Sequence, residues 1–351
     1  MGNKKTKVDW FLIGIILFLT GLSLLILFSD QKELFNNQLI SVGIGFFLFL
    51  IFSFFPYQFF KKISLPLFIF SLFLLFLTLI LGKTARGATR WLNFGPFSFQ
   101  PSEVIKPLLA IILANQPDNL IPFSIFLPFA AIIFAQPDLG TTIAISFGAM
   151  GVFLKRPQTK KIFLILLFLT IVSFPLLWHF LAPFQKARLT SFLNPKDDPL
   201  GSNYQSLQAI ISIGSGKIAG RGLGLGPQSR LAFLPEYHND LIFASLVESL
   251  GFLGGIFILL AYLTLFLHLA NIDSKISDPF GKLIVSGILF LLSGQTIVNI
   301  AMNMGLLPIT GITLPLLSYG GSSYISTMIS LGICHNIWRQ SSFQPQELRI
   351  K

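Results

Sequence analysis

Long apolar stretches recur along the whole chain, and they constrain its fold more than any other feature. A helix of about 20 apolar residues spans the hydrocarbon core of a bilayer, and several stretches reach that length. Because backbone polar groups in lipid need internal partners, only helices and closed barrels can span. The stretches lack the alternation typical of barrel strands. The sequence therefore predicts an all-α polytopic integral membrane protein with about ten transmembrane helices, at 10–29, 38–55, 64–82, 102–115, 122–136, 140–154, 161–181, 241–270, 280–304 and 314–338.

The composition excludes a soluble protein. Hydrophobic residues make up 53% of the chain, charged residues only 11%, and the mean hydropathy is +0.75. A soluble protein needs far more charge to cover its surface. A net charge of +11 would suggest nucleic acid as the partner of a soluble protein. Here Lys and Arg collect in loops beside the apolar stretches, where they meet anionic headgroups, so we expect membrane lipid and no nucleic acid as a partner.

The basic residues also orient the predicted helices. If the N-terminus is cytoplasmic, most Lys and Arg of the short connecting segments fall on the inner side, as the positive-inside rule requires. The first apolar stretch ends without a small-residue cleavage pattern, so we expect it to stay as a helix. The sequence thus predicts one membrane domain over 1–351, with both termini cytoplasmic, tails at 1–9 and 340–351, an outer loop at 83–101 and a large outer loop at 182–240 between helices 7 and 8.

Two charges lie in or beside the fourth apolar stretch. Glu103 and Lys106 are three residues apart, which puts them on one face of a helix. One interpretation is an ion pair that only neutralises two membrane-buried charges. The other is that Lys106 binds an anionic ligand or positions a catalytic group, because charges in membrane helices often mark functional sites. Pro107 follows directly and should bend this helix.

Asp240 stands where the large outer loop meets the eighth apolar stretch. An Asp directly before an apolar helical run is a good N-cap, so capping is one interpretation and catalysis the other. Glu236 and His238 lie close by and could contribute acid–base chemistry. Glu248 follows about two turns deeper, where a carboxylate needs a partner.

The large outer loop contains two further patterns. Residues 204–220 have the apolar spacing of an amphipathic helix, which we expect to lie on the membrane surface. The run GRGLGLG at 220–226 is a weak nucleotide-loop signal, because it lacks the Lys-Ser/Thr ending of a phosphate loop. Flexible backbone beside Lys217, Arg221 and Arg230 could bind phosphate oxygens, and a plain turn explains it equally well. The four His and one Cys show no metal-ligand spacing, so no metal site is predicted.

Four motifs occur in order along most of the chain: GATRWLNFGPFSFQPSE at 87–103, AQPDLGTT at 135–142, YQSLQAIISIGSGKIAGRGLGLG at 204–226 with LPEYHNDLIF at 234–243, and MNMGLLPITGITLPLLSYGGSS at 302–323. With them the chain resembles the SEDS family of bacterial cell-wall polymerases, the RodA/FtsW group, and its RodA-like branch most. It departs from the family pattern at Asn239, Lys217 and Ser249, where Thr, Gly and a second Glu are usual.

The resemblance implies a peptidoglycan glycosyltransferase that polymerises lipid II at the outer face of the bacterial cytoplasmic membrane. It also implies partners: a class B penicillin-binding protein, which is a transpeptidase, and other proteins of cell elongation or division. The family's essential loop Asp falls on Asp240, and its helix-borne acid and base pair falls on Glu103 and Lys106.

For such a reaction we expect Asp240 to remove the proton of an acceptor sugar hydroxyl as it attacks the donor's anomeric carbon. The leaving lipid pyrophosphate needs cations, and the candidates are Lys106, Arg86, Arg90, Lys217 and Arg221, with Glu236 and His238 as further substrate-binding residues. The sequence specifies no cofactor, although a divalent cation, Mg²⁺ or Mn²⁺, could share the work. The alternatives are a flippase or transporter of a lipid-linked precursor, which broken helices and intramembrane charges would also suit, and a non-catalytic scaffold for cell-wall enzymes.

Overall fold

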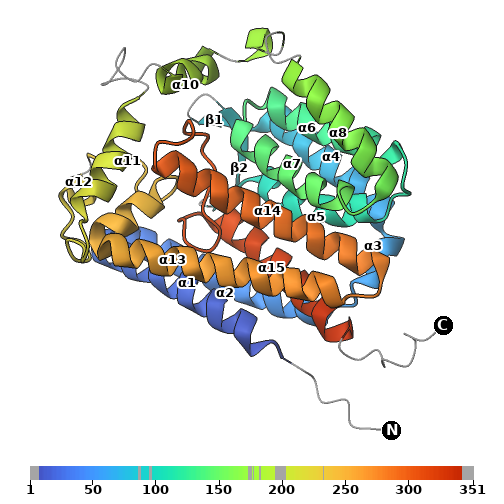
Figure 1. Ribbon diagram of the computed structural model, residues 1–351, viewed down its shortest axis with the longest axis horizontal. Helices are drawn as coiled ribbons and strands as arrows, with labels where there is room; N and C mark the ends of the chain where they lie inside the picture. The colour runs from blue at the N-terminus through green and yellow to red at the C-terminus, as the bar shows by residue number, and fades with distance from the viewer. Residues whose placement is uncertain are drawn as a thin grey trace.

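The computed structural model describes residues 8–85, 88–94, 97–172, 176, 178–181, 183–193, 203–231 and 233–341, and it is mostly helical (Figure 1). Helices overlap all the predicted apolar stretches. Five of those described are long and apolar enough to cross a membrane, which fits a polytopic membrane protein. A count of ten crossings stays a prediction. The helices at the predicted stretches are α1 (Trp10–Asp30), α2 (Lys32–Phe54), α4 (Ser64–Leu81), α5 (Pro101–Ala114), α6 (Ile121–Ala135), α7 (Leu139–Phe153), α8 (Pro157–Val172), α13 (Ile242–Lys275), α14 (Pro279–Asn303) and α15 (Gly321–Ser341).

Two features differ from the predictions: a sheet in a chain predicted to be all-α, and a late helix start. The loop predicted at 83–101 contains a small antiparallel sheet of β1 (Lys83–Ala85), β2 (Ala88–Phe94) and β3 (Phe97–Phe99), in the order β1-β2-β3. Its ladders pair Thr84 with Thr89 and Leu92 with Phe99. The last predicted helix, 314–338, begins only at Gly321, because Leu316 and Gly320 take positive φ angles that interrupt regular helix before it.

The helices carry apolar side chains on their outside. Trp10, Phe47 and Phe257 are 75%, 64% and 63% exposed, and similar exposed residues continue along α1, α2, α4, α8 and α13. Apolar surface on this scale is not left open to water by a soluble monomer. It instead matches the hydrocarbon of a bilayer, so lipid is the solvent of this surface.

The polar helix α15 lies inside the bundle, against α2. Most of its residues are buried, Ser, Thr, His and Asn among them. Gly45 and Gly332 leave no room for a Cβ, because the ring of Tyr324 and the backbone of Phe49 occupy that space. Such small residues let membrane helices approach closely. Asn336 Nδ2 also donates to the carbonyl of Ser53 at 2.7 Å, so interhelical hydrogen bonds satisfy the polar groups.

The remaining short helices are α3 (Gln58–Lys62), between α2 and α4, and η1 (Trp178–Phe180), at the end of the stretch predicted at 161–181. The predicted large outer loop contains α10 (Pro183–Leu193), α11 (Tyr204–Ser215) and α12 (Pro227–Arg230). The helix predicted at 204–220 is therefore confirmed over 204–215, and its membrane contact stays a prediction. In Figure 1, α11 and α12 lie at one end of α13.

Candidate functional site

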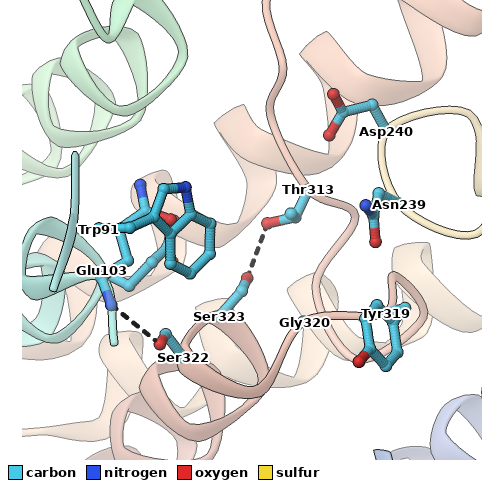
Figure 2. Close-up of a pocket in the computed structure, with 10 residues that line it drawn as sticks. Trp91, Glu103, Asn239, Asp240, Thr313, Tyr319, Gly320, Ser322 and Ser323 are labelled. Carbon is cyan, nitrogen blue, oxygen red and sulfur yellow. Dashed lines mark hydrogen bonds between the residues drawn. The ribbon is translucent and has the colours of Figure 1, made fainter. Parts of the chain in front are cut away.

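A polar cavity of about 120 Å³ lies where four separate parts of the chain meet. Glu103 and Asp240, which are far apart in the sequence, both line it. Thr313 and Ser323 lie between them and share a hydrogen bond of 2.7 Å (Figure 2). The cavity therefore brings together β2, the start of α5, the end of the large outer loop, and the segment that leads into the first turn of α15. Its wall consists of Trp91, Gln100, Glu103, Asn239, Asp240, Thr313, Tyr319, Gly320, Ser322 and Ser323.

The first turn of α5 presents Glu103 to this cavity. Pro107 has no N–H, so the carbonyl of Glu103 lacks its usual partner four residues on. Ser326 of α15 supplies the missing donor, with Oγ 2.6 Å from that carbonyl oxygen. Lys106 Nζ lies 2.7 Å from both carboxylate oxygens of Glu103, and both side chains are buried. Lys106 is not part of the cavity wall, so its first partner is Glu103.

Two asparagines of α14 hold Asp240 through its backbone carbonyl. Its carbonyl oxygen accepts hydrogen bonds from Asn299 Nδ2 at 2.9 Å and Asn303 Nδ2 at 3.0 Å, both on α14. The capping interpretation is wrong, because the N-cap position of α13 is Leu241 and no side chain caps it. The α14 asparagines leave the Asp240 carboxylate at the cavity wall, where Figure 2 draws it facing the side of Thr313.

The segment before α15 is joined to the loop that carries Asp240. Tyr319 N–H donates to the carbonyl of His238 at 2.8 Å, and Ser318 Oγ donates to the carbonyl of Asn239 at 2.7 Å. The rings of His238 and Tyr319 also meet edge to face. Glu236 accepts a hydrogen bond from Asn239 Nδ2 at 2.9 Å. Glu236 and His238 therefore lie beside the cavity wall and shape it, but do not line it.

Arg90 reaches the cavity wall through a buried aspartate. It lies on β2 next to Trp91, and its Nη1 is 3.3 Å from Asp138 Oδ1. Asp138 is 1% exposed and caps α7 by accepting from Thr141 N–H at 3.0 Å. Gln100 Nε2, on the cavity wall, donates to the other oxygen of Asp138 at 3.2 Å. This network holds the guanidinium in place without using all of its donors, and Arg86 lies outside the described residues.

Lys217 and Arg221 do not line the cavity. They are exposed and belong to a segment that pairs with α13 where that helix is broken at Gly251. Arg221 N–H donates to the carbonyl of Glu248, and the carbonyl of Lys217 accepts from Phe252 N–H at 2.8 Å. A Cβ on Gly251 would lie 2.3 Å from the backbone nitrogen of Gly220, so two glycines permit this contact. The glycine-rich run thus serves to bind the outer loop to α13.

Glu248 completes that attachment. Its carboxylate is fully buried and accepts from Ser229 Oγ at 2.7 Å, from the N–H groups of Gln228 and Ser229, and from Ser212 and Ser215 on α11. Neutral donors, several of them from a helix N-terminus, thus stabilise the charge that the sequence left without a partner. Glu248 ties α11 and α12 to the turns of α13 that directly follow Asp240.

We expect Glu248→Gln to lower the free energy of unfolding by about 3 kcal/mol. An amide NH₂ would face donors instead of accepting from them, and charge-assisted hydrogen bonds contribute about 1.5–3 kcal/mol each. Thermal unfolding in detergent measures this loss. The control is Glu33→Gln, which makes the same change on the exposed first turn of α2. Equal melting temperatures for the two variants would contradict the structural role of Glu248.

Among the described residues, no group of three or more His, Cys, Asp and Glu side chains could hold a metal ion. The cavity does offer the carboxylates of Glu103 and Asp240 and several hydroxyls, which are oxygen donors of the kind that Mg²⁺ binds. Glu103 is already occupied by Lys106, and a divalent cation stays a prediction.

Sequence reasoning named Glu103, Lys106, Asp240 and Arg90, but it missed several residues that build the site. Asp138, Gln100 and Trp91 lie inside the quoted motifs, as do Thr313, Ser322 and Ser323, the two serines directly after a Gly-Gly pair. Their signal was an unusual density of polar side chains within apolar surroundings. Asn299 and Asn303, four residues apart on α14, give the same signal.

Three comparisons place the chain among known proteins. It is 33% identical to "Peptidoglycan glycosyltransferase MrdB" of Escherichia coli (strain K12), over 95% of this chain and 96% of that one. It is 35% identical to "Stage V sporulation protein E" of Bacillus subtilis (strain 168), over 98% and 100%. Its fold matches a chain from a peptidoglycan synthase complex with a TM-score of 0.83 and 29% identity, over 96% and 99%.

The family model for cell cycle proteins of the FtsW, RodA and SpoVE type matches residues 6–343, which is nearly the whole chain. The matched region contains every element of the cavity and all four sequence motifs. This chain therefore belongs to the FtsW/RodA/SpoVE family, the SEDS proteins.

Proposed function

We propose that this chain polymerises lipid II, with Asp240 as the general base. As a SEDS protein it is a peptidoglycan glycosyltransferase that serves cell elongation or division. The observation that carries the assignment of the site is the meeting of Glu103 and Asp240 in one polar cavity. A membrane helix and an outer loop contribute one carboxylate each, which suits a substrate whose headgroup sits at the membrane face and whose tails lie in lipid.

In the proposed reaction an acceptor sugar hydroxyl attacks the anomeric carbon of the donor. The new glycosidic C–O bond forms while the bond to the lipid pyrophosphate breaks, and the pyrophosphate leaves with the electron pair. The carboxylate of Asp240 takes the hydroxyl proton as attack proceeds, since a hydroxyl is a poor nucleophile near neutral pH. Because Glu103 is paired with Lys106, its supporting role is to hold the sugar by accepting a hydrogen bond.

The growing charge on the pyrophosphate needs cations that are already in position. Arg90 is the described candidate that the geometry favours, because Asp138 orients it beside the cavity wall. The assignments of Lys106, Arg86, Lys217 and Arg221 to the same task stay predictions. An arginine fork matches phosphate oxygens bidentately, which a lysine cannot do.

Arg90→Lys should therefore lower kcat/KM for lipid II by roughly ten- to a hundredfold, the effect of one lost hydrogen bond to a charged group. Initial rates of polymer formation measure it. Arg339→Lys, a matched change in the last turn of α15, should leave the rate unchanged. Wild-type kcat/KM in Arg90→Lys would remove Arg90 from the substrate site.

The proposal also covers the membrane side of the cavity, the protein partner and the branch of the family. The outer face of the bacterial cytoplasmic membrane is the expected side of the cavity, with both chain ends cytoplasmic, since α15 begins at the cavity and runs away from it toward the C-terminus. A class B penicillin-binding protein is the proposed partner, supported by the fold match to a chain of a peptidoglycan synthase complex. Preference for the RodA-like branch stays a prediction, since relatives with different family names match equally well.

The decisive experiment supplies lipid II to the purified protein with its partner, with moenomycin present to silence classical transglycosylases. Long glycan strands are the expected product. Movement of lipid II across liposomes without polymer would favour a flippase, and neither activity would favour a scaffold.

A further inference from the structure

A second polar cavity, of about 300 Å³, lies at the opposite end of α5 from Glu103. It sits between the short helix α3, the first turn of α4 and the loop after α5, in the region where Figure 1 labels α3. Its wall combines basic, neutral polar and apolar side chains: Lys61, Lys62, Ser64, Leu65, Phe68, Asn115, Gln116 and Ile125. We propose that this cavity binds the phosphate headgroup of an anionic phospholipid, such as phosphatidylglycerol.

The charge of the side chains at this cavity favours an anion. Lys61 and Lys62 are exposed at its rim and have no acidic neighbour in the cavity wall. Asp118 lies two residues after Gln116 of the wall but is not part of the wall itself. Its carboxylate accepts from the N–H groups of Gln158 and Thr159. Basic pockets between membrane helices are typical binding sites for phosphate headgroups.

The start of α4 adds backbone donors. The first N–H groups of a helix have no partner within the helix, and the N-terminal end of the helix dipole attracts anions. No side chain caps α4, whose N-cap is Ile63. Since Pro66 has no N–H, the donors left at this end are those of Ser64 and Leu65. The helix has 18 residues, so its dipole is well developed.

Ser64 supplies an independent sign of a missing ligand. The residue lines the cavity and is 3% exposed, and its Oγ has no hydrogen-bond partner among the described residues. A buried hydroxyl without a partner costs about 1–3 kcal/mol, and a phosphate oxygen in the cavity would be an acceptor for it. Asn115 Nδ2 donates to the carbonyl of Lys61 at 3.1 Å, which holds the two-lysine segment against the end of α5.

The surroundings favour a lipid over a free phosphate ion. Leu65 in the cavity wall is 67% exposed, and Ile69 and Phe73 continue from it at four-residue spacing with 59% and 58% exposure. Residues at this spacing form one stripe along a helix. Acyl chains attached to a headgroup in the cavity would therefore lie along the lipid-facing side of α4.

Native mass spectrometry of the purified protein, titrated with phosphatidylglycerol or phosphatidylcholine, tests this site. Lys61→Gln with Lys62→Gln should weaken phosphatidylglycerol binding roughly thirtyfold, the expected contribution of two lysines near a lipid surface. Lys160→Gln with Lys161→Gln removes the same charge from an exposed pair on α8, which does not line the cavity, and should change binding by less than about twofold. Equal losses in the two double variants would overturn the proposal.

A serine pair provides a second, uncharged test. Ser64→Ala should weaken phosphatidylglycerol binding by roughly three- to tenfold, as expected for one hydrogen bond. Ser71→Ala is the control, because Ser71 lies on the same helix, is equally buried, also lacks a hydrogen-bond partner among the described residues and does not line the cavity. Equal affinity for both lipids in the wild type, or displacement of bound lipid by millimolar inorganic phosphate, would also overturn the proposal.

Discussion

Asp240→Asn is expected to abolish polymer formation from lipid II, with a loss of roughly a hundred- to ten-thousandfold in kcat, the usual contribution of a positioned general base. The amide cannot accept the hydroxyl proton. Folding should be preserved, because Asn299 and Asn303 bind the backbone carbonyl of Asp240, which the substitution keeps. Quantifying glycan strands made by the purified protein with its partner gives the measurement.

Two further variants serve as controls for this test. Glu33→Gln, a carboxylate-to-amide change on the exposed first turn of α2, should polymerise like the wild type. Asp240→Glu keeps the charge but moves it by one methylene, and should recover only part of the lost rate, because a misplaced base transfers protons poorly. Wild-type polymer from Asp240→Asn would refute the assignment of the base.

The second large effect concerns the buried pair of Glu103 and Lys106. Lys106→Met leaves the Glu103 carboxylate buried without its cation, which should cost about 3–5 kcal/mol of stability together with activity. Replacing both residues, Glu103→Gln with Lys106→Met, removes the unpaired charge. The double variant should therefore regain most of the stability while polymerisation stays lost.

Comparing thermal unfolding with polymer formation in the single and double variants separates the two interpretations of the pair. If the pair only neutralises buried charge, the double variant will recover both properties. If Glu103 holds substrate, as its place in the cavity wall suggests, the double variant will recover stability but not polymer formation. A double variant that is both stable and active would show that the pair has no part in the reaction.

Local sequence patterns predicted the helices well, because a residue in lipid must satisfy its backbone polar groups within its own helix. They failed where backbone groups find partners elsewhere. The sheet at β1–β3 lies outside the apolar stretches, so hydropathy carried no signal for it. The late start of α15 depends on positive φ angles at Leu316 and Gly320, which a count of apolar residues cannot register.

The candidate site shows the same division. Charge within apolar surroundings is costly, so Glu103, Lys106 and Asp240 could be selected from the sequence. The roles of their neighbours could not. Asn299 and Asn303 hold Asp240 from 59 and 63 residues away, and Ser326 replaces the donor that Pro107 removes from α5 across a distance of 223 residues. Such long-range partners appear only when the helices are packed.

The sequence by itself therefore determined that lipid surrounds the chain, that the fold is mostly helical, and which charged residues required explanation. Each of these follows from local polarity. Only the tertiary structure decided which charges meet. It paired Lys106 with Glu103, supplied serine donors of the outer loop to the Glu248 carboxylate, and brought Asp240 to the cavity that Glu103 lines. The reason is physical: burial of a charge is a local cost, but its compensation comes from groups that the packing of distant helices supplies.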